Sequence, residues 1–163
     1  MALIWPEFEQ NYNKTMENII EIAKKEIGTI ESPINSNKTK YGEWFGLNGV
    51  PWCAIFVSWV YFYAGKKLPN IGFKLGFAGC QTGFVYFKQK GWITKEPLPG
   101  NIVLFDWNND GRYDHTGIFV KWIDKENFET IEGNTSIKNQ SNGGIVMIRK
   151  RNVNTAIFIN PKI

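Results

Sequence analysis

The chain has 163 residues, 43% hydrophobic and 15% aromatic, a composition that predicts one folded domain with its own core and excludes a disordered chain. Its net charge of +4 includes no dense basic run, which argues against nucleic-acid binding and suits an anionic polymer surface. No apolar segment reaches membrane-spanning length.

The start of the chain lacks the basic, apolar and cleavage regions of a secretory signal. We therefore expect synthesis in the cytoplasm without a signal peptide, with any role beyond the membrane depending on another export route.

The first predicted helix has apolar residues at helical spacing and ends at Gly28: Met16, Ile19, Ile20, Ala23 and Ile27. Residues 29–49 are rich in Asn, Ser, Pro and Gly and are predicted to form a long irregular loop. Because this loop is polar and directly precedes a cysteine-bearing helix, we predict that residues 31–48 line a substrate groove. Asn37, Tyr41 and Trp52 are the candidate substrate-binding residues.

A second helix is predicted over residues 51–64, with one apolar face made of Ile55, Phe56, Trp59, Phe62 and Tyr63. A third is predicted over residues 82–90, ended by Gly91. After residue 91 the spacing of the apolar residues changes to the alternation typical of strands. Strands are predicted over residues 101–106, 115–123, 127–132, 144–150 and 155–159. Helices followed by strands indicate an α+β domain with an antiparallel sheet.

Cys53 falls in the first turn of the second predicted helix, after Pro51 and Trp52. Unpaired amide groups and the positive dipole end of a helix favour a thiolate there. The alternative is a buried structural cysteine, with which the apolar neighbours of Cys53 are compatible. A disulfide between Cys53 and Cys80 is also open, although it would consume this nucleophile.

His115 is the only histidine, and it begins a strand where the chain would hold its imidazole rigidly. Glu132 and Asn134 follow at the end of the next predicted strand, where either could accept a hydrogen bond from the ring and fix its tautomer. A thiol, an imidazole and a polar orienting group are the parts of a cysteine hydrolase. Structural roles for the histidine and for the two turn residues are the alternatives.

These motifs resemble the cysteine, histidine-dependent amidohydrolase/peptidase (CHAP) family of the papain-like clan, whose members cut peptidoglycan. The resemblance spans nearly the whole chain, roughly residues 19–161, and its segments are residues 28–31, 37–41, 48–59, 99–103, 114–118 and 131–135. It implies that Cys53 is the nucleophile, His115 the base, and Glu132 and Asn134 the orienting groups. It also implies a papain-like CHAP fold of the α+β class, with about three N-terminal helices packed on a twisted antiparallel β-sheet.

The activity implied is that of an endolysin-type peptidoglycan hydrolase, which needs no cofactor for its chemistry. The target bond is either the N-acetylmuramoyl–L-alanine amide or a peptide bond of the stem or cross-bridge. We expect residues 1–163 to be a single catalytic domain. Whether they are the N-terminal part of a longer protein with a wall-binding domain is left open. The expected partner is bacterial peptidoglycan, reached through holin-dependent release, by a monomer without nucleic acid or stable membrane association.

Residues 106–114 carry a second, independent motif that matches the front of an EF-hand calcium loop. Its oxygen ligands, with glycine at position 6, would be Asp106, Asn108, Asp110, Asp114 and the backbone oxygen of Arg112. Position 12 is Gly117, so the bidentate glutamate is missing, and the segment does not lie between two helices. The alternatives are a weak calcium site and a metal-free polar turn.

Two other functions are compatible with the sequence. An antibacterial effector or a conjugation-associated wall hydrolase would use the same chemistry in another setting. A non-catalytic, calcium-dependent wall-binding module would need residues 106–114 and not Cys53.

Overall fold

A computed structural model describes residues 5–163. The first four residues, which belong to the N-terminal segment in which we looked for a secretory signal, lie outside the described part. Helices precede strands along the chain, as predicted for an α+β domain. The helices are α1 (Trp5–Lys25), α2 (Lys40–Phe45), α3 (Cys53–Tyr63) and α4 (Cys80–Gln89), and a short 3-10 turn covers Val153–Thr155. The strands are β1 (Ile93–Thr94), β2 (Ile102–Phe105), β3 (His115–Trp122), β4 (Asn127–Thr135), β5 (Ile145–Asn152) and β6 (Ala156–Ile159).

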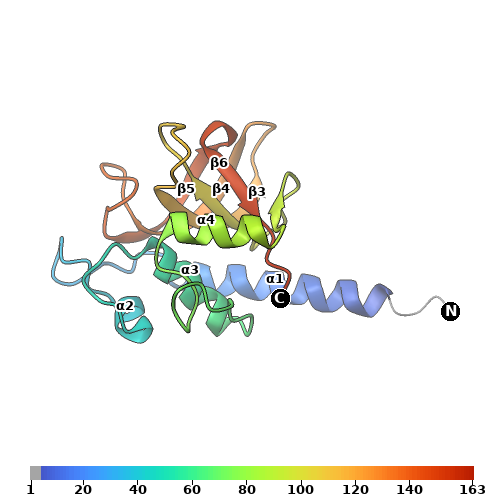
Figure 1. Cartoon of the computed structure of the whole chain (residues 1–163), viewed down its shortest axis with the longest axis horizontal. Helices are drawn as coiled ribbons and strands as arrows, with labels where there is room; N and C mark the ends of the chain where they lie inside the picture. The colour runs from blue at the N-terminus through green and yellow to red at the C-terminus, as the bar shows by residue number, and fades with distance from the viewer. Residues whose placement is uncertain (1–4) are drawn as a thin grey trace.

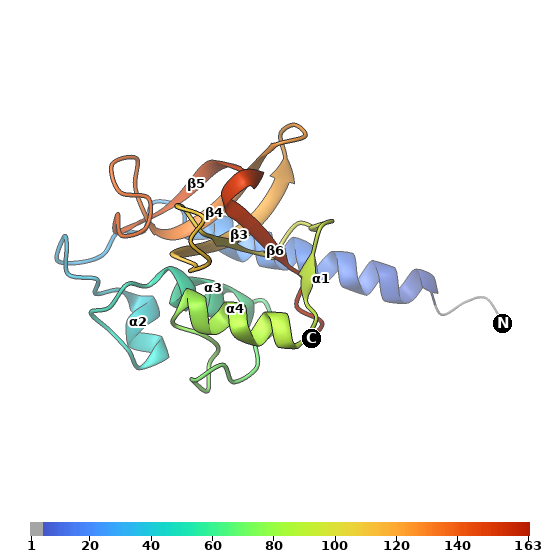
Figure 2. The same ribbon diagram turned by 45° about the horizontal axis from the view of Figure 1, so that its top comes forward.

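The strands form one antiparallel sheet of six strands in the order β1-β6-β2-β3-β4-β5. Figures 1 and 2 show this sheet on one side of the molecule and the helices on the other, with α1 extending past the sheet toward the N-terminus. The predicted fold class, with about three helices packed on the sheet, is confirmed. No helix within residues 5–163 is long and apolar enough to cross a membrane.

Alternation along the strands divides the apolar residues between the two faces of the sheet. On β2, Ile102 and Leu104 join the core between sheet and helices, whereas Val103 and Phe105 join a smaller cluster on the opposite face. The larger core places α3 against β3 and β4, and α1 against α3 and β3. This packing fixes the first turn of α3 relative to the strands that carry His115 and Glu132.

Helix α3 differs from the prediction in how it is buried. Ile55 and Phe56 are buried, but Phe62 and Tyr63 are 37% and 50% exposed, so the predicted apolar face is only partly buried. Most residues of α3 are apolar, and the helix is surrounded by α1, α2 and the sheet, so it is buried around most of its circumference. Its bounds, and those of α4, otherwise fall within two residues of the predicted ones.

Residues 29–49 are not the continuous irregular loop that the sequence predicted, because they contain α2. The Thr39 side chain accepts a hydrogen bond from the Gly42 amide, and Gly46 ends the helix at φ 80°. The two-residue strand β1 was also missed. The first helix begins well before Met16, and Ile27 lies beyond its end with 40% of its surface exposed.

Candidate active site

Cys53 is the first residue of α3, and the residue is only 5% exposed. The preceding residue, Trp52, occupies the N-cap position and makes no side-chain capping bond. The first amides of the helix are therefore left free to face the thiolate or a developing negative charge.

His115 begins β3, where it pairs with Phe105 of β2, and its side chain is fully buried. The amide of Asp114, one residue earlier, donates to the Phe105 carbonyl at 2.7 Å. Thr116, one residue later, donates its hydroxyl to the Val103 carbonyl at 2.7 Å. The imidazole is thus anchored from both sides by the β2–β3 ladder, which provides the rigidity expected of a positioned base.

Glu132 lies within β4, and its Oε2 is 2.9 Å from Nε2 of His115. Thr130 donates its hydroxyl to Oε1 at 2.7 Å, and Arg151 donates to both carboxylate oxygens. Gly117 makes this approach possible, since a Cβ there would lie 2.5 Å from Cγ of Glu132. In the fold, the Glu132 side chain occupies the space that a side chain at position 117 would need.

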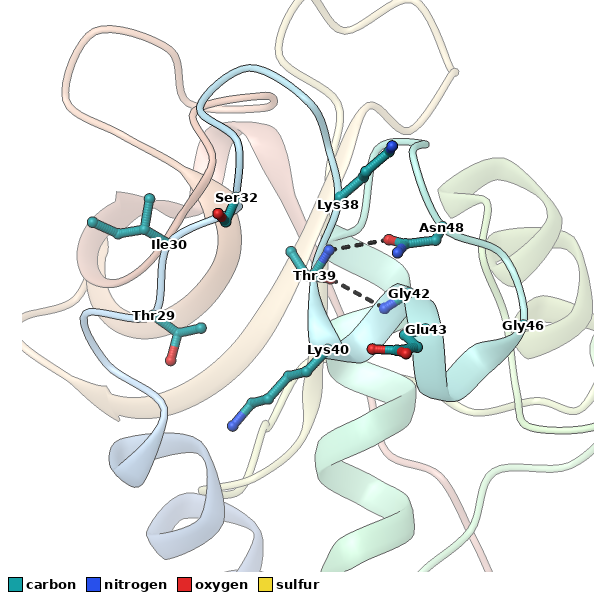
Figure 3. A pocket seen from close by; sticks show the side chains of 10 residues that line it. All are labelled: Thr29, Ile30, Ser32, Lys38, Thr39, Lys40, Gly42, Glu43, Gly46 and Asn48. Atoms are coloured by element: carbon teal, nitrogen blue, oxygen red, sulfur yellow. Dashed lines mark hydrogen bonds between the residues drawn. The ribbon is translucent and has the colours of Figure 1, made fainter.

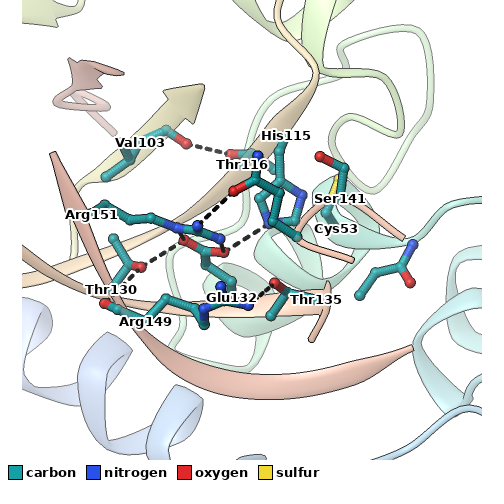
Figure 4. Close-up of polar contacts among 12 residues, drawn as sticks. Cys53, Val103, His115, Thr116, Thr130, Glu132, Thr135, Ser141, Arg149 and Arg151 are labelled. Atoms are coloured by element: carbon teal, nitrogen blue, oxygen red, sulfur yellow. Dashed lines mark hydrogen bonds and ion pairs between the residues drawn. The ribbon is translucent and has the colours of Figure 1, made fainter. Parts of the chain in front are cut away.

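The Nδ1 atom of His115 is buried and has no hydrogen-bond partner among residues 5–163. Figure 4 shows the Cys53 side chain beside this ring, on the side away from Glu132. Burial alone would lower the pKa of His115, but the charges of Glu132 and Cys53 and the hydrogen bond to Glu132 raise it to about 9. The imidazole is therefore protonated near neutral pH.

The Cys53 thiol has a pKa well below its ordinary value. The largest cause is a hydrogen bond with Cys80, whose Sγ lies 3.8 Å from Sγ of Cys53. Burial opposes this effect, while the charge of His115 and the backbone of Thr116 lower the pKa further. Both pKa shifts favour a thiolate–imidazolium pair, the reactive state of a cysteine nucleophile.

Arg151, which the sequence did not single out, holds Glu132 in its ionised form. Burial raises the pKa of Glu132, but the Arg151 hydrogen bonds and the His115 charge outweigh it and bring the pKa to about 2. The guanidinium also stacks on the rings of Trp107 and Phe105, at 4.8 and 5.3 Å from their centroids. An arginine within a strand belongs to no local sequence motif that would mark it as functional. Only knowledge of the β4–β5 pairing would have identified Arg151 as a partner of Glu132.

Asn134 does not lie against the imidazole, so the structure does not give it the orienting role predicted from the sequence. Its amide nitrogen donates to Asn142 at 3.0 Å, and its side-chain oxygen accepts from the Gly144 amide at 3.0 Å. Asn134 also has φ 55°, at an irregularity in β4 between Glu132 and Thr135. These contacts hold the turn before β5, and within residues 5–163 the side-chain hydrogen bond of His115 goes to Glu132 and not to Asn134.

Two of the three predicted substrate-binding side chains are inaccessible to a substrate. Tyr41 and Trp52 are fully buried and stack with ring centroids 5.4 Å apart. The Tyr41 hydroxyl donates to Glu26 at 2.6 Å, and the Trp52 indole donates to Glu31 at 3.2 Å. These two residues pack the core instead of contacting substrate. Asn37 is half-buried in its loop, where its carbonyl accepts from Gly49, and its substrate role stays a prediction.

The predicted groove segment does border a pocket, shown in Figure 3 between the strand-like segment of Thr29 to Ser32 and helix α2. Its floor is held by Thr39, which accepts from Gly42 and whose amide donates to Asn48 at 3.0 Å. Neither Cys53 nor His115 is among its lining residues. This pocket therefore lies apart from the thiolate.

The acidic segment 106–114 is held by its own backbone. Asp106 accepts hydrogen bonds from the amides of Asp110 and Gly111, and Asp110 accepts from the amide of Arg112. Asp114 accepts from the amide of Trp107, and the Asn108 side chain donates to Asp110. No group of three or more His, Cys, Asp or Glu side chains in the described chain is arranged to hold a metal ion. The residues present do not fit a preformed calcium cage, and calcium binding stays a prediction.

Comparison with known families gives one match. The CHAP domain family matches residues 45–134, more than half of the chain, and this segment includes Cys53, His115 and Glu132. No match to a curated protein sequence was found.

Proposed function

The chain belongs to the CHAP domain family of cysteine- and histidine-dependent amidohydrolases and peptidases, and we propose that it cuts peptidoglycan with Cys53 as its nucleophile. Family membership implies hydrolysis of amide or peptide bonds in peptidoglycan in general. The observation that carries the assignment of roles is the buried series from Cys53 to His115 to Glu132, with a hydrogen bond of 2.9 Å between the last two.

In the first step, the Cys53 thiolate attacks the amide carbonyl carbon. The charge that develops on the carbonyl oxygen lies near the free amides of the first turn of α3, where the Cys53 N–H can donate to it. His115 then gives its proton to the leaving amine as the carbon–nitrogen bond breaks. This role requires an imidazolium in the resting enzyme, which the raised pKa of His115 supports.

In the second step, water hydrolyses the thioester, with His115 now acting as general base. Glu132 keeps the imidazole in one orientation and stabilises its positive charge, and Arg151 keeps Glu132 ionised. The protein groups account for every proton transfer, and the scheme includes no metal step.

The bond that the enzyme cuts can be identified from the acyl group that remains on Cys53 in the thioester intermediate. An N-acetylmuramoyl–L-alanine amidase leaves a muramoyl group on the sulfur, whereas an endopeptidase leaves a peptide. We would incubate the enzyme with purified, defined wall fragments, quench in acid and measure the intact protein mass. In parallel, digests of walls should release new amino groups without new reducing sugar.

The matched control is Cys53→Ala, which should carry no acyl group and release no amino groups while melting like the parent protein. Release of reducing sugar, or acylation that survives this substitution, would overturn the proposal.

The endolysin-type setting is a finer part of the proposal. In this setting the chain is a monomeric single catalytic domain, made in the host cytoplasm, that reaches the wall through a holin. The test is expression in a susceptible host with and without a holin. Lysis that needs both the holin and Cys53 supports it, and lysis of neighbouring cells by enzyme exported without a holin favours an antibacterial effector instead.

A further inference from the structure

Cys53 and Cys80 are the only cysteines in the sequence, and their sulfur atoms lie 3.8 Å apart. In the described chain both thiols are free, with 5% and 8% of each residue exposed. They are 27 positions apart and belong to different helices, so the tertiary fold brings them together. In the proposed hydrolysis only Cys53 attacks the substrate, and Cys80 contributes only through its hydrogen bond to Cys53.

Two helix N-termini meet at this pair. Cys53 is the first residue of α3 and Cys80 the first of α4, and neither helix has a side-chain capping bond. The free amides and positive dipole ends of both helices favour negative charge on sulfur. The Cys80 hydrogen bond lowers the pKa of Cys53, and the same contact raises the pKa of Cys80. A thiolate therefore lies next to a protonated thiol.

We propose that Cys53 and Cys80 form an oxidisable dithiol site, which reacts with hydroperoxides and reversibly switches off the nucleophile. The Cys53 thiolate first attacks an oxygen of the hydroperoxide. A sulfur–oxygen bond forms as the oxygen–oxygen bond breaks, and the departing oxygen takes a proton and leaves as water or an alcohol. Cys53 is then a sulfenic acid.

The sulfur of Cys80 next attacks the sulfur of the sulfenic acid. The disulfide bond forms as the sulfur–oxygen bond breaks, and the hydroxide leaves as water with the Cys80 proton. The pair of cysteines loses two electrons, and the hydroperoxide gains them. Loss of the Cys53 charge in the first step also removes one cause of the raised pKa of Cys80, which favours its attack.

The movement needed is small. The sulfur atoms are 3.8 Å apart, and a disulfide holds them at about 2 Å, so closure is a displacement on the scale of a side chain. Helix α4 buries only Cys80, Gly83 and Phe87, whereas α3 is buried over most of its residues. Because α4 is held by fewer buried side chains, the displacement falls mainly on Cys80.

The switching effect rests on the proposed role of Cys53, because a sulfur in a disulfide cannot attack an amide. A reducing compartment keeps the pair as thiols and the hydrolase active, and an oxidising one converts it to the inactive form. Cys80 would also protect Cys53 from irreversible oxidation to sulfinic and sulfonic acids.

The test treats the full chain with hydrogen peroxide, removes the peroxide, and measures free thiols, intact mass and wall lysis before and after dithiothreitol. We expect both free thiols to be lost and the intact mass to fall by the mass of two hydrogen atoms. A peptide map should show Cys53 linked to Cys80. Lysis should fall in proportion to the linked fraction and return with reduction. Cys80→Ser, compared with its own untreated activity, should lose lysis without recovery because Cys53 is over-oxidised.

The outcomes separate this inference from the proposed hydrolysis. If the parent protein lyses walls and Cys53→Ser does not, but peroxide yields no linked peptide or the loss is not reversed, the switch is overturned and the hydrolase assignment stands. If the linked peptide forms and lysis is unchanged, the nucleophile assignment and the switch both fail, while the dithiol chemistry remains. Equal recovery in the parent and Cys80→Ser would also overturn the switch.

Discussion

Arg151 and Glu132 form a buried ion pair in which Nε of the arginine donates to Oε1 at 2.7 Å and a terminal nitrogen donates to Oε2. Oε2 also lies 2.9 Å from His115, and Oε1 accepts from Thr130. The carboxylate is thus held on every side and cannot rotate away from the imidazole. Arg151 therefore helps to orient His115 by holding Glu132 in place.

Replacing Arg151 with leucine should destabilise the protein, because it leaves the Glu132 charge buried without its main partner. Removing one member of a buried pair costs about 3–5 kcal/mol. The control is Arg149→Leu on the same strand, which loses bonds to Thr135 and Ser136 but none to Glu132, at a cost of about 1 kcal/mol. Urea unfolding of both variants measures the difference, and equal losses would contradict the role given to Arg151.

Cys53→Ala and His115→Ala should each reduce wall hydrolysis by about 10⁴-fold or more, because the nucleophile and its base act as one unit. For the same reason the double variant should be no worse than either single one. Initial rates on purified walls, at matched concentrations of folded protein, give the comparison. Losses that multiply in the double variant would mean that the two residues act independently.

The members of the site that the sequence predicted share a simple property: each lies in a strong local pattern. Cys53 opens an apolar helix, and His115 and Glu132 lie on consecutive strands joined by a short turn, so their pairing is local. Arg151 could not be predicted, because it reaches Glu132 only through the register of β4 and β5, which pairs Arg151 with Phe128 and Glu132 with Met147. That register shifts between Glu132 and Thr135.

The segment before Cys53 was misread for a different reason. Its polar composition predicted an exposed loop, yet Tyr41 is fully buried against Trp52. Thr39 and Gly46 carried a signal for the short helix between them, an N-cap hydroxyl and a C-terminal glycine. Helix α2 is too short to show apolar periodicity, so composition outweighed these caps in the prediction.

Gly117→Ala should abolish most activity by displacing Glu132. A Cβ at this position would lie 2.5 Å from Cγ of Glu132 and 3.2 Å from the Ile131 carbonyl oxygen. Gly79→Ala is the control, because its Cβ would meet nothing closer than Thr82 at 3.5 Å, and its φ of −118° suits alanine. Lysis rates and thermal melting should fall for Gly117→Ala and not for the control. Normal turnover by Gly117→Ala would show that the Glu132 position is not critical.

Calcium binding is tested by chelation. Because the carboxylates of segment 106–114 already accept backbone hydrogen bonds, we expect a chelator to leave the melting temperature and lysis unchanged. Asp106→Ala should still destabilise the turn by about 1–3 kcal/mol, since two amides lose their acceptor. A melting temperature that rises with millimolar calcium and not with magnesium would support the calcium-site prediction.

The pH dependence should follow the three coupled groups, with opposite signs for the histidine and the glutamate. The pKa of His115 is raised from 6.5 to about 9, so its contribution to stability is complete below pH 6.5 and is lost as the pH rises through about 9. The pKa of Glu132 is lowered from 4.5 to about 2, so its contribution is present above pH 4.5 and is lost as the pH falls through about 2.

For activity, kcat/KM should have an alkaline limb near pH 9, where the imidazolium loses the proton that the leaving amine needs. Glu132→Gln removes the charge that raises the pKa of His115, so the alkaline limb should move to lower pH. Turnover should also fall, because the amide leaves Arg151 without its carboxylate. Profiles of kcat/KM on soluble wall fragments, measured for both proteins, decide the matter. An alkaline limb at the same pH in both would show that Glu132 does not set the protonation of His115.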